Sequence, residues 1–103
     1  MRILTAAVIL AAASATAAFA QTERLTDTQY IAAAKCRGLM QGADTAAIDA
    51  VLSANRAGRV GVVLDRAEAA RKAAERKVRR ANGPGGKAEV AREVAGACTA
   101  FTS

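Results

Sequence analysis

Apolar side chains recur along most of this chain at every third or fourth residue, the spacing that places them on one face of an α-helix. The longest run of this kind covers residues 60–81. Its apolar positions fall on one side of the predicted helix, at Val60, Val63, Leu64, Ala67, Ala70, Ala74, Val78 and Ala81. The pattern predicts one long helix over 60–81, with its apolar face covered by the other segments.

The apolar face of this long helix is uneven along its length. Residues 60–64 carry valine and leucine, whereas alanine dominates from Arg66 onward. Each alanine removes little surface from water, so this half either docks closely against another alanine-rich helix or projects partly from the bundle. Arg71 interrupts the face. We expect its stem to lie over alanines while its head reaches water, and a paired or partner-facing charge is the alternative.

Two helices are predicted before the long one. Thr26 and Gln29 have the spacing of a capping box, which predicts a first helix over 27–41. Asp44 is a good N-terminal cap for a second helix over 45–57.

A last helix follows the clearest break in the chain. The run Asn-Gly-Pro-Gly-Gly over 82–86 interrupts helical structure, and the apolar spacing resumes over 87–101. The sequence therefore predicts an all-α fold, a small four-helix bundle of irregular or orthogonal type. We find no linker that divides it, so residues 21–103 are expected to form a single small domain.

The two cysteines of the chain, Cys36 and Cys98, fall on the apolar faces of the first and last predicted helices. We therefore predict one disulfide between them. In the loop-entropy description, a bridge across so long a segment stabilises the fold by about 4 kcal/mol. A redox-active pair is disfavoured because there is no Cys-x-x-Cys spacing and no histidine. A bridge between two chains stays open as an alternative.

Residues 1–20 have the pattern of a signal peptide. Arg2 precedes an apolar run over 3–13, and the small-x-small sequence that ends at Ala20 is a cleavage site. We expect cleavage between Ala20 and Gln21 and export to the periplasm or the medium, an oxidising setting that suits the disulfide. An uncleaved anchor is the alternative, but the apolar run is short for a membrane span.

Positive charge gathers on the long helix. The chain carries 15 Lys and Arg residues against 9 Asp and Glu, a formal net charge of +6. The side of the long helix opposite its apolar positions forms a basic face made of Arg66, Lys72, Arg76, Lys77, Arg79 and Arg80. Like charges at i,i+4, such as Arg76 and Arg80, cost a little stability. A use for positive charge is one interpretation, and an ordinary solvated helix face is the other.

Residue types that carry chemistry are scarce. The absence of histidine excludes Ser–His and Cys–His pairs and most zinc sites. The run Gly85-Gly86-Lys87 lacks the preceding strand and the following Ser or Thr of a phosphate loop. Glu89 and Glu93 lie one turn apart, and we expect them on an exposed helix face. The sequence predicts no enzyme, no cofactor and no metal site.

The leading functional hypothesis is a non-catalytic exported helical protein whose basic face binds an acidic envelope protein or an anionic polymer of the envelope. The alternative is a periplasmic stress-response or holdase-type chaperone, although the lack of histidine removes the simplest pH sensor. The hypothesis of binding to a membrane surface has less support, because the face opposite the charges lacks Trp and Phe and has little Leu, the side chains that insert into an interface. Export and the lack of a stacking platform disfavour nucleic acid. The oligomeric state is left undefined.

Overall fold

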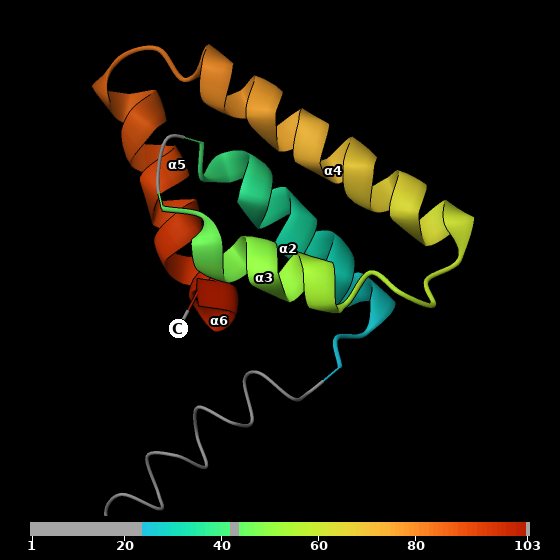
Figure 1. Ribbon diagram of the computed structural model, residues 1–103. Coiled ribbons are helices and arrows are strands. Elements are labelled where there is room, and N and C mark those ends of the chain that lie inside the picture. The colour runs from blue at the N-terminus through green and yellow to red at the C-terminus, as the bar shows by residue number, and fades with distance from the viewer. Residues whose placement is uncertain (1–23, 42–43, 103) are drawn as a thin grey trace, which may run out of the picture.

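The computed structural model describes residues 24–41 and 44–102, and these residues form five helices. In chain order they are α2 (Asp27–Leu39), α3 (Ala46–Ala54), α4 (Gly61–Arg80), α5 (Pro84–Ala97) and α6 (Thr99–Thr102) (Figure 1). The part of the chain that is described contains no strand, so the all-α prediction is confirmed. The predicted signal peptide and its cleavage site lie outside the described residues.

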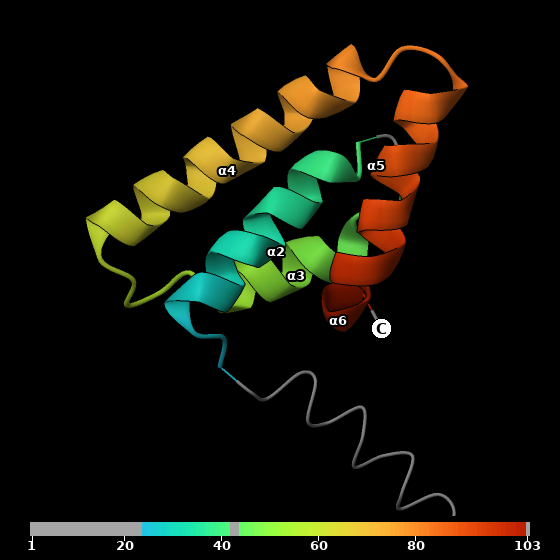
Figure 2. The same ribbon diagram turned by 180° about the vertical axis from the view of Figure 1, so that it is seen from behind.

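Helix α2 lies at the centre of the arrangement. Helix α4 packs along α2 and runs in the same direction, while α3 runs back along another side of α2 (Figure 1). Helix α5 leaves the end of α4 and crosses the C-terminal end of α2, and α6 then packs against α3 (Figure 2). None of the helices within 24–41 and 44–102 combines the length and the apolarity that a membrane span requires.

The start of α2 follows the predicted capping box. The backbone N–H of Gln29 donates to Thr26 Oγ1 over 3.1 Å, and the backbone N–H of Thr26 donates to Gln29 Oε1 over 2.9 Å. Helix α3 is shorter than predicted, over 46–54 instead of 45–57. Asp44 lies one residue before its cap position, where its carboxylate accepts the backbone N–H of Ala46 over 3.1 Å.

The predicted last helix is corrected at both ends. It begins at Pro84, three residues earlier than expected, because proline fits the first helical position, where no N–H partner is needed. Gly83 makes the turn just before it with φ 88°, a left-handed conformation that glycine adopts without steric cost. Cys98 then separates α5 from α6. The predicted helix over 87–101 is therefore two helices, and the described residues form five helices in place of the predicted four.

Two clusters of buried side chains form the core. One lies between the first turns of α2 and α4, with Tyr30, Ala34, Val63 and Ala67 at its centre. The other lies where α5 crosses α2 and α4, and contains Cys36, Leu39, Met40, Ile48, Ala74 and Cys98. Leu52 packs against both. Val60, predicted on the apolar face, is 61% exposed because it precedes α4 at the edge of the bundle.

The alanine-rich half of α4 docks closely on α2, which was one of the two expectations for it. The contact is closest at Gly38, which is buried. A Cβ added there would lie 2.3 Å from the Arg71 carbonyl oxygen and 2.8 Å from the Ala74 Cβ. The two helices are thus nearer than any side chain at position 38 would permit. The close contact between their small residues adds dispersion attraction, which offsets the small apolar area that each alanine buries.

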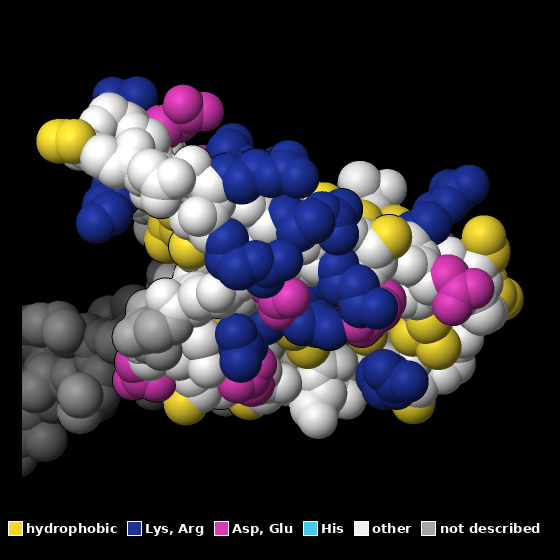
Figure 3. Space-filling view, turned by 90° about the horizontal axis from the view of Figure 1, so that it is seen from above, with side chains coloured by type: hydrophobic (Ala, Val, Ile, Leu, Met, Phe, Trp, Pro, Cys, Tyr) yellow, Lys and Arg dark blue, Asp and Glu magenta, His cyan; other side chains and the backbone are white. Residues whose placement is uncertain are grey.

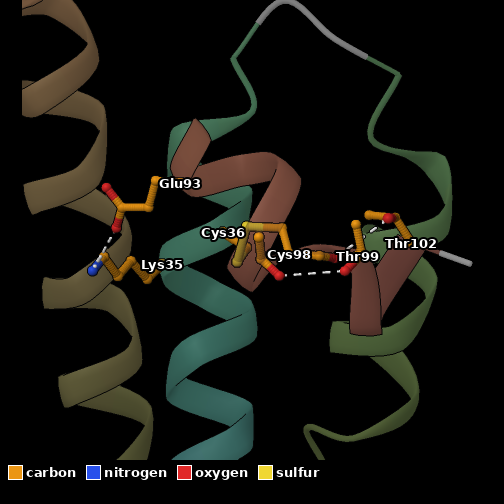
Figure 4. Close-up of a disulfide and its surroundings, with 7 residues drawn as sticks. Lys35, Cys36, Glu93, Cys98, Thr99 and Thr102 are labelled. Atoms are coloured by element: carbon orange, nitrogen blue, oxygen red, sulfur yellow. Dashed lines mark hydrogen bonds and ion pairs between the residues drawn. A yellow bond between two sulfur atoms is a disulfide. The ribbon is translucent and has the colours of Figure 1, made fainter. Parts of the chain in front are cut away.

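The disulfide between Cys36 and Cys98 joins α2 to the end of α5, with Cα atoms 5.6 Å apart (Figure 4). Both cysteines are buried, as their predicted positions on the apolar faces required. The predicted pairing is therefore confirmed, and it holds α5 across the end of α2 where the second core cluster forms.

The opposite end of α2 is held by polar contacts around Arg59, whose side chain is only 4% exposed. Its guanidinium pairs with Asp27 over 2.7 Å, donates to the carbonyls of Leu25 (2.6 Å) and Asn55 (2.9 Å), and lies 4.8 Å from the centre of the Tyr30 ring. The Asn55 side chain accepts the backbone N–H of Leu25 over 2.9 Å. This network joins the starts of α2 and α4 to the end of α3.

Candidate functional site

All six residues of the predicted basic face are exposed on α4. Figure 3 looks down onto this helix and shows Lys and Arg side chains gathered over it, with a few carboxylates among them. The distinction that matters is which of these cations already has a carboxylate partner within the protein.

Two cations in the middle of α4 are paired along the helix. Arg71 binds the carboxylates of Glu68 and Glu75, so the alternative of a paired charge holds for this residue. The hydrogen bond to Glu68 is the main reason that the pKa of Arg71 is raised and the pKa of Glu68 is lowered. Lys72 lies 4.0 Å from Glu68. These charges are accounted for by pairing within one helix.

Lys77 is paired with α5. Its ammonium lies 2.8 Å from Glu93 and 3.6 Å from Glu89. Glu93 also accepts a hydrogen bond from Lys35 of α2 at 2.8 Å (Figure 4). Through Lys35 and Lys77, this one carboxylate links α5 to both α2 and α4. The hydrogen bonds from Lys35 and then Lys77 lower the pKa of Glu93, and the bond to Glu93 raises the pKa of Lys77. Glu93 is 23% exposed, which corrects the expectation of two plainly exposed carboxylates.

The remaining four members of the basic face have no carboxylate partner among the described residues; they are Arg66, Arg76, Arg79 and Arg80. Arg76 and Arg80 lie one turn apart on the same side of α4, where like charges repel by roughly 0.2–0.5 kcal/mol. Free arginine head groups therefore concentrate at the C-terminal end of α4.

A hollow of about 430 Å³ lies between this end of α4 and the first turns of α5. Arg76, Lys77 and Arg80 line it from α4, and Glu89 lines it from α5. The rest of its lining is small or apolar and comes from both helices: Ala73, Ala81, Gly86 and Val90. The structure thus brings three of the six predicted residues together around an apolar floor.

The other three members of the basic face lie outside the lining of this hollow. Arg66 is ten residues before Arg76, about 15 Å along the helix. Lys72 is turned toward Glu68, and Arg79 is exposed beside the hollow. Within the described residues, the basic face therefore has a paired middle at Lys72, an unpaired Arg66 before it, and an end beside the hollow where Arg76, Arg79 and Arg80 lack a carboxylate partner and Lys77 has one.

A second hollow, of about 270 Å³, lies between α2, α3 and α4. Its floor is apolar, formed by residues such as Tyr30 and Leu64. Its rim carries Asp49 and Glu68 together with Arg56 and Arg71, so the charges there balance. Asp49 is bonded by Thr45 and Arg37, which lower its pKa. This hollow has no excess charge that would select a ligand.

The hollow between α4 and α5 can bind an anion beside a small apolar group. Sequence patterns identified its arginines, because they lie on one helix. The residues from α5 were missed, since their relation to α4 depends on how the helices dock; the short turn between the two helices was the one available signal. No group of three Cys, Asp or Glu side chains within the described residues is arranged to hold a metal ion.

No protein-family model matches the chain, and neither the curated proteins nor the solved structures include a significant match to it. The functional assignment therefore depends on the geometry and charge of the molecule itself.

Proposed function

We propose that this chain is a small exported, non-catalytic helical protein that binds an acidic partner of the cell envelope through the basic face of α4. The observation that carries the proposal is the group of exposed arginines at the end of α4 that lack carboxylate partners among the described residues. Export is supported by the pattern of residues 1–20, and the buried disulfide is compatible with an oxidising compartment.

The ordinary explanation for cations at this place is the helix dipole, which favours positive charge in the last turn. That explanation covers Lys77, Arg79 and Arg80, which are the basic residues of the last turn of α4. It does not cover Arg76 or Arg66, which lie earlier in the helix and make no ion pair with another described residue. The excess of free charge therefore favours an external partner.

The first test is capture of a partner from intact envelope by the tagged protein, with crosslinking and with washes at low and high salt. Attraction between exposed charges is screened by salt, so we expect a specific acidic component that is lost at high salt. The variant Arg76→Glu/Arg80→Glu is expected to lose it with unchanged helix content. The control Arg56→Glu/Arg92→Glu changes the net charge equally at exposed positions that belong to α3's following loop and to α5 and lie outside the basic face, and is expected to keep it.

Equal capture by both variants, or capture that resists high salt, would sink the assignment of the basic face. Absence of any partner under either wash would favour the chaperone alternative, which predicts that the protein suppresses aggregation of an unfolded client.

Export is tested by the mass of the protein that is recovered after expression of the full chain in a bacterial host. We expect a chain that starts at Gln21, and retention of residues 1–20 would contradict it.

A further inference from the structure

We propose that the hollow between α4 and α5 binds an acidic peptide segment of a partner protein, in which carboxylate side chains flank an aliphatic side chain such as leucine. This inference rests on the proposed function and deepens it, because it specifies the place on the basic face and the chemistry of the ligand. Three features of the hollow carry it: two arginines that pair with no carboxylate of the described chain, an apolar floor and the position of Glu89.

The two arginines supply the carboxylate sites. Arg76 and Arg80 line the hollow one turn apart, so their Cβ atoms are about 6 Å from each other. A guanidinium offers its donors in a planar fork that matches the two oxygens of a carboxylate. With no internal carboxylate on either arginine within the described chain, both forks are available to an incoming ligand.

The apolar floor supplies the site for the aliphatic side chain. Ala73 and Ala81 of α4 and its following turn face Gly86 and Val90 of α5 across the hollow. Their side chains are small or absent, and this leaves the volume of about 430 Å³ open. Val90 also packs against the core cluster that contains the disulfide, so the floor of the hollow is continuous with the core.

Glu89 already places one carboxylate of the protein itself at this rim. It lies 3.6 Å from Lys77, whose closer partner is Glu93 at 2.8 Å. The charge of Lys77 is therefore already matched within the protein. Binding by an acidic peptide then depends on Arg76 and Arg80, and Lys77 serves to hold α5 in position beside them.

A peptide fits these features better than a membrane surface does. Interfacial binding needs large apolar side chains beside the cations. The large apolar side chains that are strongly exposed in the described chain are Val60 and Val62, at the other end of α4 and about 27 Å from Arg80. The described aromatic residues, Tyr30 and Phe101, are buried and half-buried, so the described part of the chain offers no stacking platform for nucleotide bases.

The test uses the full chain, expressed with isotope label and recovered in its oxidised form, and two synthetic peptides. The probe is an acetylated Gly-Glu-Leu-Glu-Gly amide, and the reference has glycine in place of leucine. Titration followed by amide chemical shifts is expected to move the signals of Ala73, Gly86 and Val90. Because leucine adds apolar area at the floor, we expect the probe to bind about tenfold more tightly than the reference.

Two matched pairs of variants separate the hollow from the rest of the basic face. Arg80→Glu is expected to lower probe affinity at least tenfold, while Arg79→Glu, with the same charge change at the adjacent exposed position, changes it less than threefold. Ala73→Phe fills the hollow without changing charge, and should erase the preference for the probe over the reference. Ala69→Phe, one turn earlier and outside the hollow, should preserve it.

The hollow is supported as the peptide site if Arg80→Glu and Ala73→Phe have the expected effects on peptide binding and their controls, Arg79→Glu and Ala69→Phe, do not. Equal losses for Arg79→Glu and Arg80→Glu, with no effect of Ala73→Phe, would overturn the hollow but leave a diffuse basic face and the proposed function intact. Absence of any shift with either peptide would also overturn the hollow. The proposed function is then decided separately by the envelope capture and its charge-matched control.

Discussion

The two ends of the α2–α4 pair use arginine in opposite ways. At the start of α2, Arg59 is almost fully buried, and its donors are taken up by one carboxylate and two backbone carbonyls. At the end of α4, Arg76 and Arg80 are exposed and bind no carboxylate of the described chain. Arginine thus stabilises the fold at the Arg59 end, which we call the fastened end. At the other end, called the open end, Arg76 and Arg80 are exposed to solvent.

The difference follows from what else holds each end together. Around Arg59 the chain runs through loops that leave backbone carbonyls without helical partners, and buried carbonyls need donors. At the other end the helices are held by the disulfide, by the close contact at Gly38 and by the links to Glu93. The fold there has no need of Arg76 and Arg80, which leaves them free for a partner.

The largest effect is expected from removal of the disulfide at the open end. Replacing Cys36 and Cys98 by alanine lifts a constraint between positions 62 residues apart, which should lower the free energy of unfolding by about 4 kcal/mol. Urea denaturation measures the loss. Amide exchange should show α5 opening before the first turns of α2, and uniform opening of the whole domain would contradict the comparison.

The next effect is expected at the fastened end. Arg59→Ala removes an ion pair and leaves the carbonyls of Leu25 and Asn55 without their charged donor, which should cost about 2–3 kcal/mol in thermal or urea unfolding. Arg59→Lys should recover less than half of this, because one ammonium cannot reach acceptors arranged for a planar fork. Full recovery by lysine would mean that charge alone matters there.

Close packing between α2 and α4 is tested by a pair of glycines. Gly38→Ala places a methyl group against the Arg71 carbonyl and should destabilise by about 1–3 kcal/mol, despite the better helix propensity of alanine. Gly96→Ala on α5 meets nothing within 4 Å and should be neutral or stabilise by up to about 1 kcal/mol. Similar effects at the two positions would show that α2 and α4 separate easily.

Acid should loosen the open end through Glu93. Its pKa is lowered in the folded state by Lys35 and then Lys77, so its contribution is present above the unfolded value of about 4.3 and is lost as pH falls through the lower folded value. Glu93→Gln should reduce stability by about 1 kcal/mol at neutral pH. It should also flatten the decline of stability below about pH 4.3, measured by urea unfolding across pH. An unchanged slope would assign the acid response to other carboxylates.

The smallest effect on stability is expected where the effect on binding is largest. Arg80→Ala should change the free energy of unfolding by less than about 0.5 kcal/mol, since the side chain is exposed and makes no ion pair with a described residue. Measured beside Arg59→Ala, it gives the sharpest form of the comparison. A loss above 1 kcal/mol would show that this end of α4 depends on Arg80 for its fold.

Local patterns were enough to predict most of the secondary structure. The capping box at Thr26 and the apolar spacing of α4 depend on residues within one or two turns, and both appear as predicted. The start of α5 at Pro84 was missed, although its signal was also local: the proline that was interpreted as part of a helix break is the first residue of α5. The placement of Cys36 and Cys98 on apolar faces likewise predicted their bridge.

What the sequence alone determined, then, is the all-helical fold, the position of both cysteines on apolar helix faces and the presence of a basic face, because helix periodicity relates each of these to neighbouring residues. Only the tertiary structure decided that α4 docks on α2 at Gly38, that Glu93 engages Lys77, and that Arg76 and Arg80 stand unpaired beside a hollow. These features depend on which side chains of different helices meet. That is set by the packing of the whole bundle, and no single helix contains the information.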